Sequence, residues 1–75
     1  MVTEETRRDL KNRLEALSAD AKDKAVFATR YGLYDGLYKS YEEAGRIHGM
    51  TGEGVRLIVK KIEKAIGYDP KEVAE

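Results

Sequence analysis

The segment between residues 40 and 67 constrains most what this chain can fold into, because two helix starts and two helix ends follow in a fixed order. Ser40 with Glu43 three residues later has the pattern of a capping box, and Gly49 is placed to end a short helix in the left-handed conformation. Thr51 can cap the next helix, which Gly67 ends. Apolar side chains in this second helix recur at the spacing of one helix face, at Val55, Ile58, Val59, Ile62, Ala65 and Ile66. We therefore expect a short helix, a tight turn and a longer helix, which is the order of a helix-turn-helix.

Small residues before the turn favour a helix-turn-helix over the alternative, an ordinary helical bundle. Ala44 and Gly45 carry the small side chains that a close crossing of two helices requires. Met50 can fill the turn, and Val55 and Ile58 can reach back from the longer helix. A generic helical hairpin would not require a small residue four or five positions before its turn glycine.

The first half of the chain predicts two further helices and a loop. An amphipathic helix is expected over residues 3–17, with one apolar stripe formed by Leu10, Leu14 and Leu17. Ser18 can cap a second helix that runs to about Thr29. Glycines then end the helical pattern, so residues 31–39 are expected to form a loop. The predicted fold class is all-α, a small bundle of four helices, or five if the tail adds a turn.

Length and composition narrow the ways in which this bundle can be stabilised. A chain of 75 residues forms one small domain, expected as residues 1–67 with a flexible C-terminal tail over residues 68–75. It has no cysteine and only one histidine, His48, so it has neither disulfides nor a zinc site of the finger kind. We expect His48 to be a partly buried structural residue. Fourteen Lys and Arg balance fourteen Asp and Glu, so the overall charge indicates no partner.

The sequence predicts neither an enzyme nor a membrane protein. No apolar run approaches the roughly 18 residues of a membrane helix, and the charged N-terminal stretch does not fit a signal peptide. A domain this small leaves little room for a pocket of about 300 Å³, and the usual nucleophile and base pairs have no candidates. We expect a cytoplasmic protein without catalytic residues, metal site, cofactor, membrane contact or small-molecule substrate.

Three stretches, spread over more than half of the chain, resemble region 4 of primary-type bacterial sigma factors, their C-terminal helix-turn-helix domain. These stretches are Ala-Val-Phe-Ala-Thr-Arg-Tyr-Gly-Leu at 25–33, Ser-Tyr-Glu-Glu-Ala-Gly-Arg at 40–46, and Gly-Met-Thr-Gly-Glu-Gly-Val-Arg at 49–56. In that family the second helix of the motif lies in the major groove of the −35 promoter element. The domain also binds the flap of the RNA polymerase β subunit.

The resemblance implies DNA-facing positions at which this chain departs from the family. Those positions are Thr51, Gly52, Glu53, Arg56 and Leu57. Arginines usual at the helix start are replaced by Gly52 and Gly54, and a glutamine usual after the arginine is replaced by Leu57. Arginine and glutamine bind guanine and adenine through paired hydrogen bonds worth about 1 to 3 kcal/mol of discrimination, which glycine and leucine cannot supply. We therefore expect weakened reading of base sequence.

Contacts to DNA phosphates can survive these departures. Between residues 46 and 64 the basic side chains exceed the acidic ones by three, which is modest for a DNA-binding face. The candidate DNA-binding residues are Arg46, Thr51, Glu53, Arg56, Lys60, Lys61 and Lys64.

The scaffold that binds the flap in the family is kept in this chain. The flap-binding surface would be the apolar groove between the second helix and the motif, and the alternative is that those side chains fill the core. Leu57 lies off the apolar stripe and is expected to be exposed. The candidate partner-binding residues are Val26, Phe27, Tyr31, Leu33, Tyr34, Tyr38 and Leu57.

Three functional hypotheses follow from these observations. A lone region 4 has no domain for the −10 promoter element, so the chain is expected to modulate transcription rather than act as a complete sigma factor. In the first hypothesis it is a small regulator, of a kind that a phage could encode, which binds RNA polymerase through the β flap and competes with or repositions the host sigma factor. In the second it is a DNA-binding module that contacts promoter DNA of the −35 type. In the third it binds a sigma factor itself.

Overall fold

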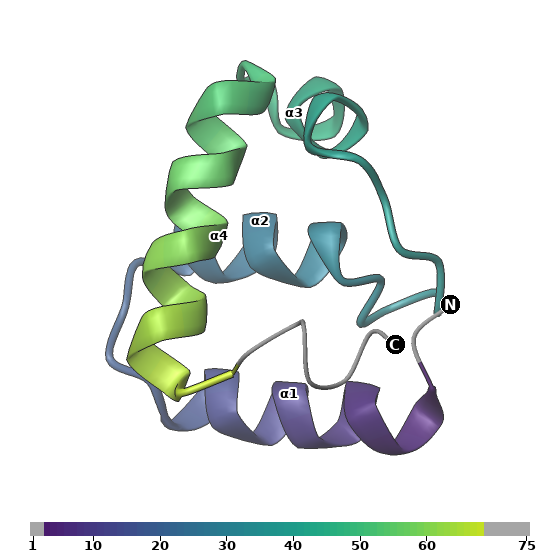
Figure 1. The fold of residues 1–75 in the computed structure, drawn as a ribbon, viewed down its shortest axis with the longest axis vertical. Helices are drawn as coiled ribbons and strands as arrows, with labels where there is room; N and C mark the ends of the chain where they lie inside the picture. The colour runs from purple at the N-terminus through teal and green to yellow at the C-terminus, as the bar shows by residue number, and fades with distance from the viewer. Residues whose placement is uncertain (1–2, 69–75) are drawn as a thin grey trace.

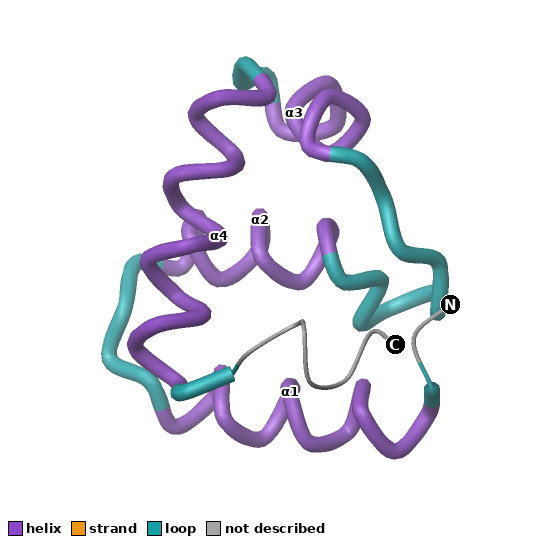
Figure 2. The backbone as a smooth tube through the Cα atoms, in the orientation of Figure 1, coloured by secondary structure: helices purple, strands orange, loops and turns teal. Residues whose placement is uncertain are grey.

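The computed structural model describes residues 3–68, which form four helices and no strand (Figures 1 and 2). The predicted all-α bundle is confirmed. Figure 1 shows α4 running along the long axis of the molecule, from α3 at one end to the end of α1 at the other. The helices are α1 (Glu4–Ala16), α2 (Ala21–Arg30), α3 (Tyr41–His48) and α4 (Gly52–Ile66).

The start of α2 differs from the prediction. Leu17 leaves the end of α1 in an extended conformation, with φ −80° and ψ 131°. Its partly buried side chain packs against the core, and α2 begins only after Asp20. Ser18 is therefore not the N-cap of α2, and the Asp20 side chain makes no capping hydrogen bond either. The predicted capping residue was wrong by two positions, because the packing of Leu17 fixes where the connection runs.

The predicted loop after α2 folds back onto the bundle. Gly32 has a φ of +61°, and a Cβ there would lie 2.4 Å from the carbonyl oxygen of Leu37, so only glycine allows this approach. The Leu33 amide donates to the carbonyl of Ala28 at 2.9 Å, which holds the start of the loop against α2. Tyr31 and Leu33 consequently enter the core from the loop.

All four helices and the loop contribute to one hydrophobic core. The buried side chains of α4 are Val55, Val59 and Ile62, which lie on the predicted apolar stripe. Ile58 and Ile66 on the same stripe are partly buried, whereas Ala65 is exposed. The other core residues are Leu10, Leu14, Val26, Phe27, Ala28, Tyr31, Leu33 and Ala44.

Tyr68, which was expected to belong to the flexible tail, is in contact with the folded unit. Tyr68 packs against the core, and its ring meets that of Tyr31 edge to face at 5.5 Å. Its amide donates to the carbonyl of Glu63 at 2.9 Å. The rest of the segment expected to be a flexible tail, residues 69–75, lies outside the described residues. Over residues 3–68, no helix has the length and apolarity needed to span a membrane.

Candidate nucleic-acid and protein interface

The α3–turn–α4 unit has the geometry predicted for a helix-turn-helix. The Glu43 amide donates to Ser40 Oγ at the start of α3, and the Gly54 amide donates to Thr51 Oγ1 at the start of α4, each at 3.1 Å. Gly49 ends α3 in the left-handed conformation, with φ 66° and ψ 37°. These three local signals were predicted correctly because each depends only on neighbouring residues.

Gly45 is the residue that allows the turn to close tightly. The Met50 amide donates to the carbonyl of Gly45 at 2.7 Å. A Cβ on Gly45 would lie 2.5 Å from the carbonyl oxygen of Met50, a distance that real side chains do not reach. The predicted need for a small residue is thus confirmed, although the close neighbour is the backbone of the turn.

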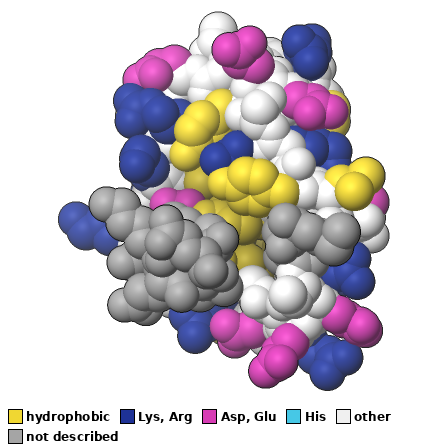
Figure 3. Space-filling model, turned by 45° about the vertical axis from the view of Figure 1, so that its right-hand side comes forward, with side chains coloured by type: hydrophobic (Ala, Val, Ile, Leu, Met, Phe, Trp, Pro, Cys, Tyr) yellow, Lys and Arg dark blue, Asp and Glu magenta, His cyan; other side chains and the backbone are white. Residues whose placement is uncertain are grey.

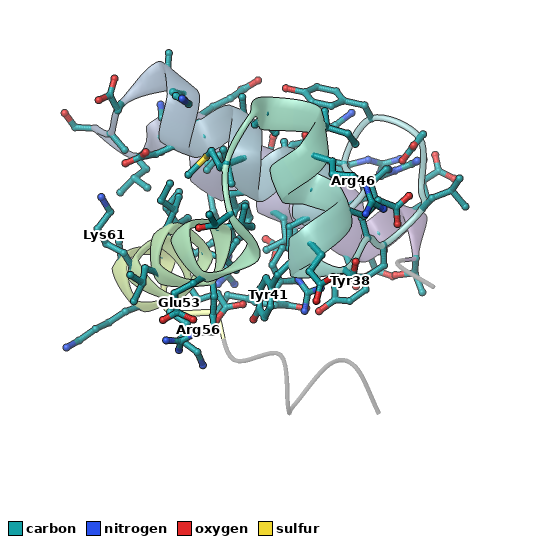
Figure 4. The ribbon with its side chains drawn as sticks, turned by 90° about the horizontal axis from the view of Figure 1, so that it is seen from above. Tyr38, Tyr41, Arg46, Glu53, Arg56 and Lys61 are labelled. Atoms are coloured by element: carbon teal, nitrogen blue, oxygen red, sulfur yellow. The ribbon has the colours of Figure 1, made fainter. Side chains whose placement is uncertain are left out.

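The candidate DNA-binding residues are split between different sides of the α3–α4 unit. Thr51, Glu53, Lys60 and Lys64 are exposed along α4, and Arg46 is exposed on α3. Lys61 instead binds Asp23 of α2, with 2.9 Å between Nζ and Oδ2. In Figure 4, Lys61 lies toward the left edge of the molecule, whereas Arg46 lies in the right half of the view, beside α3. Lys61 therefore connects two helices, and its ammonium group is engaged within the protein.

Arg56 is also engaged within the protein. Its Nε donates to Glu53 Oε1 at 3.1 Å, and its Nη2 donates to Glu53 Oε2. Figure 4 shows the two side chains together at the outer edge of α4. The hydrogen bonds from Arg56 hold the pKa of the Glu53 carboxyl below its usual range, and the same bonds raise the pKa of Arg56. The carboxylate and the guanidinium are therefore both charged at neutral pH.

Four of the candidate partner-binding residues lie inside the core. Val26 and Phe27 have exposed fractions of 0%, Leu33 has 1% and Tyr31 has 2%. Side chains this deeply buried have no surface left for a partner, so the alternative that they fill the core is the correct one.

The other three candidate partner-binding residues are exposed. Tyr34 has an exposed fraction of 76%, Leu57 of 57% and Tyr38 of 47%. Ile47 on α3 and Leu37 in the loop are also exposed apolar residues, and sequence reasoning missed both. The helical period could not have revealed Ile47, because a spacing of three residues places it on the same face of α3 as the buried Ala44.

An aromatic cluster around Arg30 lies beside these exposed residues. The guanidinium carbon of Arg30 is 4.1 Å from the ring centre of Tyr38 and 3.9 Å from that of Tyr41, and its Nη1 donates to the carbonyl of Lys39. Figure 3 shows hydrophobic and basic side chains next to one another on one face of the molecule. Neither Arg30 nor Tyr41 was a predicted site residue, because cation–π stacking joins residues eleven positions apart that no local pattern connects.

Two partly buried polar contacts support the scaffold behind this surface. The Tyr31 hydroxyl donates to Glu63 Oε2, and burial together with this bond raises the pKa of Tyr31 well above its usual range. Thr29 Oγ1 and His48 Nε2 lie 2.7 Å apart and share a hydrogen bond, so His48 is partly buried and structural, as predicted.

A surface hollow of about 410 Å³ lies beside the Lys61–Asp23 pair. It is larger than expected for so small a domain, and it lies between the α1–α2 connection, the start of α2 and the C-terminal half of α4. Within residues 3–68, no three His, Cys, Asp or Glu side chains come together in a group that could hold a metal ion. The hollow is lined by Leu17, Ser18, Ala19, Asp20, Asp23, Lys61, Ile62 and Ala65.

Comparison with known proteins finds relatives among bacterial sigma factors. The chain is 46% identical over 55 residues to the RNA polymerase sigma factor SigA of Microcystis aeruginosa and to that of Synechocystis sp., and 44% identical over 55 residues to that of Nostoc sp.. Each match covers 73% of this chain but only 12% to 14% of the sigma factor. No family model matches, and no solved structure gives a significant match.

A match of this extent is consistent with a single small domain of a much longer protein. The matches to the three SigA proteins agree with the resemblance of residues 25–56 to region 4 of sigma factors. The four-helix bundle also has the expected α3–turn–α4 order. The described part of this chain is therefore a sigma-region-4-like helical module, related in sequence to part of the SigA primary sigma factors.

Proposed function

We propose that this chain is a small transcription regulator that binds bacterial RNA polymerase through its sigma-region-4-like fold. In this proposal it docks on the flap of the β subunit and competes with or repositions the host sigma factor, as a phage-encoded regulator would do. The observation that carries the proposal is the 55-residue similarity to SigA, in which the helical scaffold is kept.

The outer face of α4 favours a protein partner over base reading. Gly52, Gly54 and Leu57 offer no side-chain hydrogen-bond donor to a base. Leu57 instead presents an apolar side chain that is 57% exposed, next to the Glu53–Arg56 pair. An apolar residue within a polar rim is the usual composition of a protein interface.

The test is binding of the purified chain to core RNA polymerase from Synechocystis sp., the source of one of the matching sigma factors. We expect the two to co-elute in size-exclusion chromatography, and an isolated β flap to retain the chain on a column. Addition of SigA from the same source should displace it. Absence of binding to both core polymerase and the flap would contradict the proposal.

Leu57→Asp tests whether α4 contributes to the interface. Placing a charge at an apolar contact should weaken polymerase binding by roughly tenfold or more, because the carboxylate loses water without gaining a partner. The matched control is Asn12→Asp, which adds the same charge at an exposed position of α1, outside the α3–α4 unit. Circular dichroism should show both variants folded, since neither side chain is in the core. Equal affinities for Leu57→Asp and the wild-type protein would remove this surface from the proposal.

A second candidate function, binding of promoter DNA, is favoured by exposed cations. Arg46, Lys60 and Lys64 are exposed on the α3–α4 unit and can contact phosphates. Tight duplex binding that depends on sequence and is abolished by Arg56→Ala would favour this function over polymerase binding. Weak binding without sequence preference is the result that the first proposal expects.

A further inference from the structure

At the start of α4, the carboxylate of Glu53 binds the guanidinium of Arg56. The Nε and Nη2 groups of Arg56 both donate to the carboxylate of Glu53, and these two groups form one edge of the guanidinium. Paired donors on a guanidinium are what bind guanine or a phosphate bidentately. In this protein Glu53 therefore occupies one of the two edges through which Arg56 could bind a nucleic acid, and it places a negative charge beside the other.

A second carboxylate lies at the same helix end. A Cβ on Gly52 would lie 3.1 Å from Cγ of Glu42, so the stem of Glu42 rests against the first residue of α4. The positive end of a helix normally attracts anions such as phosphate. Here Glu42 and Glu53 bring negative charge to that end, while the charge of Arg56 is neutralised by its partner.

The pair faces the solvent from which DNA would approach. The side chains of Glu53 and Arg56 have exposed fractions of 64% and 37%. A phosphate that reached Arg56 would have to displace a carboxylate already bound there and would then lie close to it. Separating the pair and repelling the phosphate would both weaken nucleic-acid binding.

We infer that Glu53 is a specificity-determining residue, which keeps duplex DNA off the start of α4 by holding Arg56 and so directs the chain toward a protein partner. The preference for a protein partner rests on the function proposed above. The exclusion of DNA depends only on the contacts of Glu53 and Arg56, and it can be measured without polymerase.

The test is Glu53→Gln, which removes the charge while keeping the size of the side chain. Binding to a fluorescently labelled duplex of random sequence is measured by anisotropy at several salt concentrations. We expect the variant to bind about three- to tenfold more tightly than the wild-type protein at about 50 mM salt, with a slope of log K against log salt steeper by about one. An affinity within about twofold of wild type would overturn the inference.

Two further variants separate the release of Arg56 from a simple change of charge. Glu42→Gln removes the same charge at the same helix end without freeing an arginine, and it should leave duplex affinity nearly unchanged. In Glu53→Gln/Arg56→Gln the gain should disappear. An equal gain in Glu42→Gln, or a gain that persists in the double variant, would overturn the role of Arg56.

Core polymerase binding is measured on the same proteins, so that the two proposals fail separately. If wild-type protein does not bind polymerase but Glu53→Gln gains duplex affinity as described, the proposed function is wrong and the role of Glu53 stands. If polymerase binds and the duplex affinities do not change, only the role of Glu53 is wrong.

Discussion

The surroundings of Tyr31 raise the pKa of its hydroxyl group well above the usual value. Its ring is buried against Phe27, with 4.6 Å between ring centres, and its hydroxyl donates to Glu63. Replacing Tyr31 with Phe removes the donor and leaves a partly buried carboxylate without it. A hydrogen bond to a charged group contributes about 1.5 to 3 kcal/mol, so we expect the free energy of unfolding to fall by that amount at neutral pH.

The raised pKa of Tyr31 also sets how stability changes in alkaline solution. The pKa lies above its ordinary value of 10.0 in the folded protein, first because of burial and then because of Glu63. Above pH 10 the unfolded chain releases this proton while the folded protein keeps it. The unfolded state then binds fewer protons, and the free energy of unfolding falls as pH rises, by up to about 1.4 kcal/mol per pH unit for this one group.

Urea unfolding of Tyr31→Phe between about pH 9 and 11 checks this linkage. Tyr38 and Tyr68 also have pKa values raised by burial, so the variant keeps part of the decline, but its slope averaged over this range is shallower by about half a proton. Tyr34→Phe is the matched control, because its side chain is 76% exposed, and it should keep the wild-type slope. Equal slopes for Tyr31→Phe and wild type would contradict the role assigned to the Tyr31 proton.

At the scale of elements, the turn between α3 and α4 depends on Gly45. Gly45→Ala would place a methyl group 2.5 Å from the Met50 carbonyl oxygen, and the backbone there cannot move without opening the turn. Forcing a methyl group into a closed site costs about 1 to 3 kcal/mol, so we expect a loss of that size in urea unfolding. Gly54→Ala is the control on α4, because its nearest neighbour is the flexible end of Met50 at 3.3 Å. It should be neutral or stabilise the protein by up to about 1 kcal/mol through helix propensity.

Elements defined by neighbouring residues could be predicted, and those defined by packing could not. Ser40, Gly49 and Thr51 act within one helical turn of their own positions, so their roles follow from the sequence pattern. Ser18 has the same chemistry as Ser40 but is not a cap, because Leu17 must first reach the core. A capping residue can thus be proposed from the sequence, but tertiary contacts decide which candidate is used.

The candidate interface could also be predicted only in part, because some of its features depend on neighbouring residues and others depend on packing. The exposure of Leu57 followed from the helical period of α4. The engagement of Lys61 by Asp23, and the stacking of Arg30 between Tyr38 and Tyr41, join residues from different elements. Such contacts depend on how the helices are arranged, and a single sequence contains no pattern that fixes that arrangement.

At the scale of the whole molecule, nucleic-acid binding depends more on which basic side chains are already paired with acidic ones than on how many basic side chains there are. Of the basic candidates on the α3–α4 unit, Arg56 is paired with Glu53 and Lys61 with Asp23. Arg46, Lys60 and Lys64 have no ion-pair partner among residues 3–68. The α3–α4 unit can therefore offer about three unpaired cations to a nucleic-acid backbone, and these are spread over two helices.

This distribution predicts a shallow salt dependence for the wild-type protein. Each phosphate contact contributes about −0.9 to the slope of log K against log salt, so three cations give a slope of about −3 at most. We expect binding to a duplex of random sequence to be weak, with a dissociation constant no lower than about 10⁻⁴ M at physiological salt, the weak end of nonspecific binding. Anisotropy titrations at four salt concentrations measure both quantities. A slope steeper than about −5 would mean that the internal ion pairs open on DNA, and the ranking of a protein partner above DNA would then be reversed.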